Sequence, residues 1–146
     1  NLNKRFPFLV MSFSKKNVVR GLHIQTKNPQ GKYISVIKGK IFDVVVDLRK
    51  NSKTYGKVLT TIISEKNSKS IYIPPGFAHG FCVTSDFAVV QYKCTATYSK
   101  TDENIIRWDD PSIGIDWPKL NTSPLLSTKD REACLLNDAD LPQVKS

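Results

Sequence analysis

The chain consists of short β-rich segments separated by turn signals, with almost no pattern of helical period. Strands are predicted over residues 33–38, 41–48, 58–64, 70–73, 77–83 and 87–95, and Gly, Pro, Asn, Ser and Asp recur between them. Gly39, between the first two segments, is typical of a hairpin turn. Many short strands at regular spacing favour an all-β sandwich or barrel of the jelly-roll type.

The segment 41–48 has a different character on its two faces. Phe42, Val44, Val46 and Leu48 share one face, and Asp43, Val45 and Asp47 point the other way.

Only the C-terminal part is predicted to be helical, from about Thr128 to Leu136. Its start is indicated by Ser127 and Asp130, which have the spacing of a capping box. Asp138–Ser146 are expected to form a loose terminus.

Length and composition indicate one soluble globular domain over residues 1–146. Hydrophobic residues make up 40% and charged residues 24%, and no apolar run approaches the ~20 residues that span a bilayer. The apolar patch at residues 6–11 is too short and proline-broken for a signal peptide. The three cysteines, Cys82, Cys94 and Cys134, are an odd number without CxxC spacing. We therefore expect buried thiols and a cytoplasmic protein that does not bind membranes.

The formal net charge of +9 favours an anionic partner. Nucleic acid is one candidate, but the lysines are scattered and no helix-turn-helix, zinc-finger or aromatic RNA-binding motif is present. A small phosphorylated ligand fits the charge equally well, and so does a merely solvated basic surface.

The chain contains two histidines, each beside glycine in a β-rich segment. His23 follows Gly21, and His79 ends a Pro74-x-Gly76-x-x-His79 motif. So few histidines offer little for a metal centre, so we expect no metal. His23 has a pKa suited to acid–base chemistry near neutral pH, although a histidine hydrogen-bonded in the core is the simpler alternative. For His79, the simpler alternative is a hydrogen bond to the backbone near the Pro-Gly break.

Several segments together resemble the dTDP-4-dehydrorhamnose 3,5-epimerases, in the order of that family and from about Lys16 to Asp130. They are Val19–Gln25, Gln30–Lys32, Phe42–Arg49, Ile73–Phe81, Tyr92–Thr95, Arg107–Pro111, Gly114–Pro118 and Ser127–Asp130. The resemblance implies a cupin-like double-stranded β-helix, a homodimer and an isomerase that needs no cofactor. It implies epimerisation at C3 and C5 of a nucleotide-linked 4-keto-6-deoxy sugar, a step in cell-surface polysaccharide biosynthesis.

The resemblance also implies roles for eight residues. His23 would be the base, Asp130 its partner carboxylate, Tyr92 the acid on the opposite face of the sugar, and Lys32 the cation near the C4 oxygen. Arg20, His79, Glu103 and Lys129 would bind the nucleotide, the pyrophosphate or the sugar. Such chemistry needs a base beside the carbon, stabilisation of the enolate and a donor on the other face.

Each role has a structural alternative. Tyr92 could fill the core, Asp130 could only cap a helix, and Lys32 and Lys129 could be surface lysines. Strict alternation puts Arg20 on the face opposite His23, so both reach one site only if the strand bulges near Gly21.

The family's N-terminal segment, which completes the partner's site across the dimer, has no counterpart in residues 1–146, so we expect weaker nucleotide binding and a less complete dimer. Other functions remain open at this stage. The protein could be an epimerase that acts on another nucleotide sugar, such as a GDP-linked heptose, or that inverts one centre only. It could also be a non-catalytic cupin that binds a sugar nucleotide, a metal-dependent cupin or a nucleic-acid binder.

Overall fold

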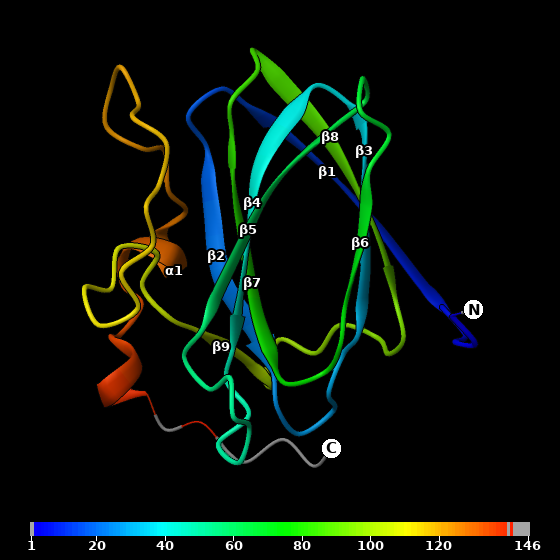
Figure 1. Ribbon diagram of the computed structural model, residues 1–146, viewed down its shortest axis with the longest axis vertical. Helices are drawn as coiled ribbons and strands as arrows, with labels where there is room; N and C mark the ends of the chain where they lie inside the picture. The colour runs from blue at the N-terminus through cyan, green and yellow to red at the C-terminus, as the bar shows by residue number, and fades with distance from the viewer. Residues whose placement is uncertain (1, 140, 142–146) are drawn as a thin grey trace.

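Two antiparallel sheets face each other in the computed structural model, which describes residues 2–139 and 141 (Figure 1). The first sheet has, in spatial order, β1 (Phe8–Lys15), β8 (Phe87–Cys94), β3 (Lys32–Lys38) and β6 (Ser70–Ile73). The second has β5 (Val58–Ser64), β4 (Lys40–Asp47), β7 (Phe77–Val83), β2 (Val19–Gln25) and β9 (Glu103–Ile105). The predicted all-β fold is confirmed, and the six predicted segments match β3 to β8 within one residue at every end.

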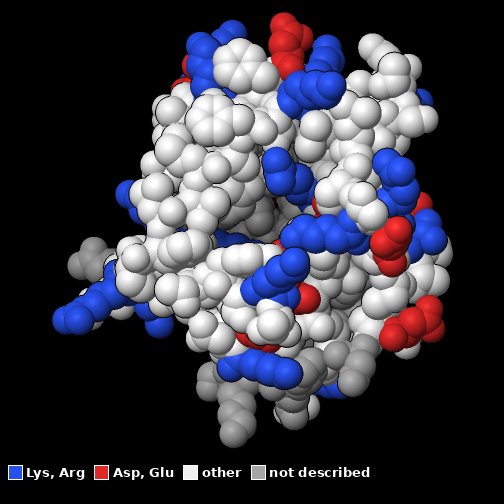
Figure 2. Space-filling model, turned by 180° about the vertical axis from the view of Figure 1, so that it is seen from behind, with Lys and Arg blue, Asp and Glu red and all other residues white. Residues whose placement is uncertain are grey.

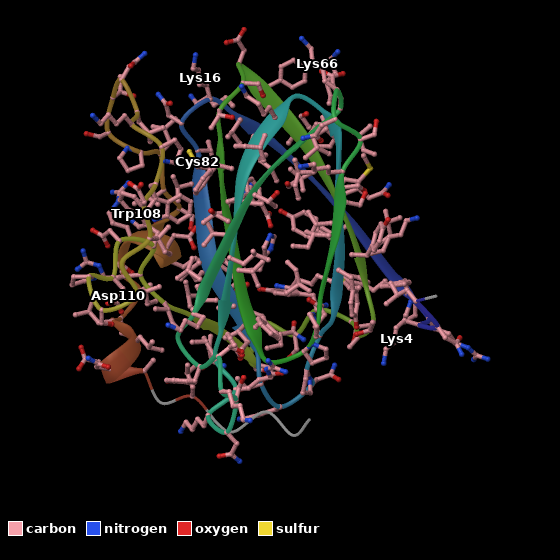
Figure 3. All side chains as sticks on the ribbon, viewed as in Figure 1. Lys4, Lys16, Lys66, Cys82, Trp108 and Asp110 are labelled. Carbon is pink, nitrogen blue, oxygen red and sulfur yellow. The ribbon has the colours of Figure 1, made fainter. Side chains whose placement is uncertain are left out.

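Apolar side chains fill both sides of the second sheet. Between the sheets, Val45 packs with Phe81 and Val90, and Figure 3 shows side chains of both sheets meeting there. On the outer side, Val44 and Val46 pack beneath the segment after β9. That segment, which carries Trp108 and Asp110, lies beside β2 outside the sheet in Figure 3. Because β4 is covered on both faces, its valines form a nearly continuous run.

Gly39 does not form the predicted hairpin. β3 pairs with β6 and β8, whereas β4 pairs with β5 and β7, so the chain changes sheets at this glycine. Gly39 has a φ of +83°, and an added Cβ would lie 2.1 Å from the carbonyl oxygen of Phe87. A corner packed this closely against backbone requires glycine, as a hairpin turn also does, and composition alone does not distinguish the two.

The predicted C-terminal helix is much shorter than expected. α1 spans Thr128–Arg131, and a 3₁₀ turn, η1, spans Leu136–Asp138. Between them the chain leaves the helix to bond the body of the protein: the amide of Arg107 donates to the carbonyl of Cys134, and the amide of Leu136 donates to Asp110 at 2.6 Å. Tertiary hydrogen bonds thus replace helical ones. Of the loose terminus predicted for Asp138–Ser146, residues 140 and 142–146 lie outside the described residues.

Two strands and one exposed thiol were not predicted, and β2 was predicted only as a β-rich segment around Gly21, without bounds. β1 forms from the apolar patch near the start of the chain, and β9 has only three residues. Cys82 and Cys94 are buried as expected, but Cys134 is exposed because it lies on the outer C-terminal segment. Within residues 2–139 and 141, no helix is long and apolar enough to cross a bilayer.

Candidate active site

A cavity of about 460 Å³ opens between the two sheets, within the ~300–1,000 Å³ usual for small-molecule sites. All eight residues predicted for the site line it: Arg20, His23, Lys32, His79, Tyr92, Glu103, Lys129 and Asp130. Figure 2 shows a hollow in the middle of one face, with Lys and Arg side chains around it. The fold therefore brings together residues separated by up to 110 positions in the sequence.

The predicted bulge near Gly21 is present in β2. Its pairing with β7 shifts register between Arg20 and His23, which lets both side chains line the same cavity. A Cβ on Gly21 would lie 2.5 Å from the Cα of Gly80. The close approach of the two backbones therefore excludes any side chain at position 21.

His23 lies between two carboxylates. Its Nδ1 is 2.7 Å from Oε1 of Glu103, and its Nε2 is 2.5 Å from Oδ1 of Asp130. Burial alone would lower the pKa of His23, but the hydrogen bonds to Asp130 and Glu103 outweigh it and raise the pKa above 6.5. The arrangement therefore favours the imidazolium form.

Asp130 serves both as a helix cap and as a partner of His23. Ser127 accepts a hydrogen bond from the Asp130 amide and donates its hydroxyl to Oδ2 of the Asp130 side chain at 2.7 Å. Although burial would raise the pKa of Asp130, His23 and Ser127 lower it. The two interpretations of this residue are thus compatible, because the cap fixes the carboxylate that meets the ring.

Glu103 joins His23 to the rim of the cavity. Its Oε2 accepts from Nζ of Lys129 at 2.6 Å and from the hydroxyl of Tyr98 at 3.0 Å. Burial would raise the pKa of Glu103, but His23 and Lys129 together lower it to about 2. Glu103 is therefore ionised near neutral pH.

This depressed pKa predicts an acid-sensitive stability. A carboxylate with a lowered folded pKa stabilises the fold above its unfolded pKa and loses that contribution as the pH falls through the folded value. We expect wild-type protein to exceed Glu103→Gln in unfolding free energy at pH 6 by at most about 3 kcal/mol. The difference should shrink between pH 4.5 and about 2, as measured by urea unfolding.

Glu65→Gln is the matched control for this prediction. Glu65 also pairs with a lysine, at 3.0 Å from Lys38, but at the surface, where such pairs contribute little. Its difference from wild type should stay small throughout. A wild-type advantage over Glu103→Gln that did not change with pH would contradict the assigned pKa.

Tyr92 and Lys32 reach the cavity from the sheet opposite His23. Tyr92 lies on β8 with its hydroxyl 3.3 Å from Oγ of Ser12 on β1, and burial raises its pKa above the usual 10.0. Lys32 begins β3 beside β8, and burial lowers its pKa below 10.5. The tyrosine thus keeps its proton at neutral pH, and His23 and Tyr92 approach the same space from two sides.

His79 and Arg20 are the last two of the predicted site residues that line the cavity. His79 Nε2 lies 2.7 Å from Oδ1 of Asp43, not against backbone. The guanidinium of Arg20 donates to the hydroxyl of Ser14 from Nε at 3.1 Å and from a terminal nitrogen at 3.0 Å. Ser14 therefore holds this cation at the cavity wall.

The sequence profile described as dTDP-4-dehydrorhamnose 3,5-epimerase matches residues 1–138. The chain belongs to this family. A family member from Neisseria gonorrhoeae is 53% identical over 119 residues, which are 82% of this chain and 36% of the relative. One from Methanothermobacter thermautotrophicus is 51% identical over 121 residues, 82% of this chain and 65% of the relative. The chain thus spans about a third and just under two thirds of these two epimerases.

A crystal structure of a family member from Legionella pneumophila, in complex with dTDP-4-keto-L-rhamnose, superposes with a TM-score of 0.94. It is 44% identical and covers 99% of this chain and 78% of its own. The predicted cupin-like β fold is confirmed by this likeness as well as by the two facing sheets. 

Sequence reasoning missed several residues of this epimerase-family cavity. They include Phe8, Val10 and Ser12 of β1, together with Gln25, Gln30, Cys94, Tyr98 and Ser127. The β1 residues were missed because that strand was not predicted. Tyr98 lies in a stretch without periodic pattern, and only its contact with Glu103 marks it.

Proposed function

We propose that this protein is a cofactor-independent 3,5-epimerase that converts dTDP-4-dehydro-6-deoxy-D-glucose into dTDP-4-dehydro-L-rhamnose. The observation that carries the proposal is the opposition of two proton-transfer groups across one cavity. The His23–Asp130 pair lies on the β2 side and Tyr92 on the facing sheet. Inversion at carbon requires removal of a proton on one face of the ring and delivery on the other.

His23 must be neutral to act as a base, so the favoured imidazolium first gives one ring proton to solvent and releases the carboxylate bonded there. Asp130 is held by Ser127 and almost fully buried, whereas Glu103 keeps Lys129 and Tyr98 as partners if it leaves the ring. Breaking the hydrogen bond between Glu103 and His23 therefore costs less free energy than breaking the one between Asp130 and His23. In this proposal Asp130 keeps Nε2–H, and Nδ1 removes the proton from the carbon beside the ketone, as the orienting carboxylate of a catalytic triad allows.

Lys32 and Tyr92 complete the proposed step. The electron pair of the broken C–H bond moves to the C4 oxygen, and the Lys32 ammonium stabilises that enolate charge. As the enolate collapses back to the ketone, Tyr92 gives its phenolic proton to the same carbon from the opposite face. The tyrosinate then takes a proton from solvent, and His23 releases the proton it removed to solvent. Repeating the sequence at the second carbon flanking the ketone inverts both centres.

The cations around the cavity fit a diphosphate ligand. Arg20, Lys32 and Lys129 line it, and guanidinium and ammonium groups bind phosphate oxygens by charge-assisted hydrogen bonds. In the proposal Arg20 and Lys129 bind the diphosphate, and Glu103 and His79 contact the sugar or nucleoside.

Turnover of alternative nucleotides tests this substrate assignment. The protein is incubated without metal with the dTDP-linked and the GDP-linked 4-keto-6-deoxy sugar, and products are followed by NMR. We expect the L-configured product from the dTDP sugar. Faster conversion of the GDP sugar would contradict the assignment.

We also propose a homodimer formed through β1, in a cytoplasmic protein whose free cysteines suit a reducing compartment. β1 is an edge strand whose outward-facing side chains, apart from Lys15, are apolar. Leu9 is 55%, Met11 41% and Phe13 72% exposed, and Phe87 beside them is 50% exposed. Contiguous apolar side chains on a free strand edge favour pairing with a second chain.

Phe13→Glu is therefore expected to shift the monomer–dimer equilibrium toward monomer by at least tenfold, as measured by concentration-dependent light scattering. A charge would be buried without a partner in the proposed interface. Leu59→Glu is the control, since Leu59 is 58% exposed on β5, the edge of the other sheet. Equal effects of both variants, or none, would remove β1 as the interface.

A further inference from the structure

The cavity wall contains a second histidine–aspartate pair besides His23 and Asp130. His79 on β7 is the register partner of Val45 on β4, so Asp43 lies two residues along the same face of the neighbouring strand. Oδ1 of Asp43 is 2.7 Å from Nε2 of His79, and their side chains are only 1% and 3% exposed. The pair is therefore built into the sheet and shielded from solvent.

Asp43 is only half satisfied. Its Oδ2 is buried and, among the described residues, has no hydrogen-bond partner. A buried carboxylate oxygen without a partner destabilises a fold, and an apolar residue of similar size would often be better there. Packing therefore does not explain an aspartate at this position, whereas a requirement placed on His79 does.

The pair fixes which nitrogen of His79 carries a proton. A carboxylate only accepts hydrogen bonds, so Nε2 must be the donor. Among the described residues, Asp43 is the hydrogen-bond partner of this ring. The ring lines the cavity, with its centroid 6.2 Å from that of Tyr92 in an edge-to-face arrangement. In the neutral ring Nδ1 then has a free lone pair, next to the proposed proton donor.

We propose that Asp43 is a positioning residue that acts through His79 and makes Nδ1 a hydrogen-bond acceptor toward the sugar. An acceptor pairs with a hydroxyl and repels a carbonyl oxygen. His79 thus selects the orientation in which a ring hydroxyl, and not the C4 ketone, meets Nδ1, which leaves the ketone to Lys32. This inference rests on the proposed function for the identity of the sugar, but the tautomer of His79 is a property of the free protein.

The first test is the ¹⁵N spectrum of the histidine rings in the ligand-free protein. The chain has two histidines, so a His23→Gln variant leaves a single imidazole to assign. Long-range ¹H–¹⁵N correlations should show His79 as the neutral Nε2–H tautomer at neutral pH. An Nδ1–H tautomer or a doubly protonated ring would overturn the proposal, and neither result depends on activity.

The second test is Asp43→Asn, whose amide can either accept from Nε2 or donate to it. We expect a mixture of tautomers, a kcat/KM for the dTDP-linked sugar at least tenfold lower, and a melting temperature no lower than that of wild type. An unchanged tautomer together with unchanged kcat/KM would overturn the proposal. Loss of activity that only followed a loss of folded protein would also count against it, since a structural role predicts that result.

Asp47→Asn is the matched control. Asp47 is on the same strand and is 2% exposed, but it bonds Arg49, Ser52 and Thr54 in a loop away from the cavity. This variant should lose thermal stability while the His79 tautomer and the kcat/KM of the folded protein stay as in wild type. If wild-type protein turns over no dTDP sugar, the proposed function fails, and the tautomer measurement still decides the role of Asp43.

Discussion

His23→Ala is expected to lower epimerisation of the dTDP-linked 4-keto sugar by about a thousandfold or more. Loss of a positioned general base typically costs ~10²–10⁴-fold in rate, and His23 is the group we propose to serve at both carbons. Removing the ring also takes away the hydrogen-bond partner that Glu103 and Asp130 share. The measurement is the initial rate at saturating substrate, with circular dichroism and thermal unfolding as checks on the fold.

His23→Gln separates chemistry from structure. A glutamine can still bond one of the two carboxylates but cannot accept a proton near neutral pH. It should be more stable than His23→Ala and equally inactive. Turnover within a few-fold of wild type in either variant would show that another group removes the proton.

Tyr92→Phe is expected to reduce product formation by about a hundredfold while proton removal continues. The phenol is the proposed donor on the face opposite His23, and its hydroxyl forms a hydrogen bond of 3.3 Å with Ser12. In D2O the variant should therefore incorporate deuterium into recovered substrate faster than it forms product. The measurement compares the two rates by mass spectrometry and NMR.

Tyr33→Phe is the control for this substitution. Tyr33 lies on β3, contacts Phe6 at a centroid distance of 6.1 Å and does not line the cavity. Its variant should exchange and convert substrate at wild-type rates. If exchange and product formation fell equally in Tyr92→Phe, the tyrosine would have no special role in delivering the proton.

Most strands could be predicted because their alternation and turn residues are local properties. Alternation correctly placed Asp43 and Val45 on the face opposite Val44 and Val46. Pairing between sheets is not local, so Gly39 was taken for a hairpin when it is a corner. The length of the helix from Thr128 was overestimated for the same reason. The tertiary hydrogen bonds that end the helix join residues far apart in the sequence, and the local pattern does not indicate them.

Motifs predicted most residues of the site, but they did not predict the hydrogen bonds between those residues. The eight residues line one cavity as expected, and the bulge at Gly21 followed from the conflict between Arg20 and His23. The bonds of His23 to Glu103, 80 residues away, and of His79 to Asp43, 36 residues away, depend on strand register. Register is set by the whole sheet, so only the structure reveals these pairs.

Deuterium incorporation by the wild-type protein tests the central claim most directly. The protein is incubated in D2O, without added metal, with dTDP-4-dehydro-6-deoxy-D-glucose, and deuterium at C3 and C5 is located by NMR and counted by mass spectrometry. The account predicts two deuterons in a product inverted at both centres. Deuterium at a single carbon would contradict the 3,5-epimerase assignment, and none at either carbon would contradict the proposed chemistry as a whole.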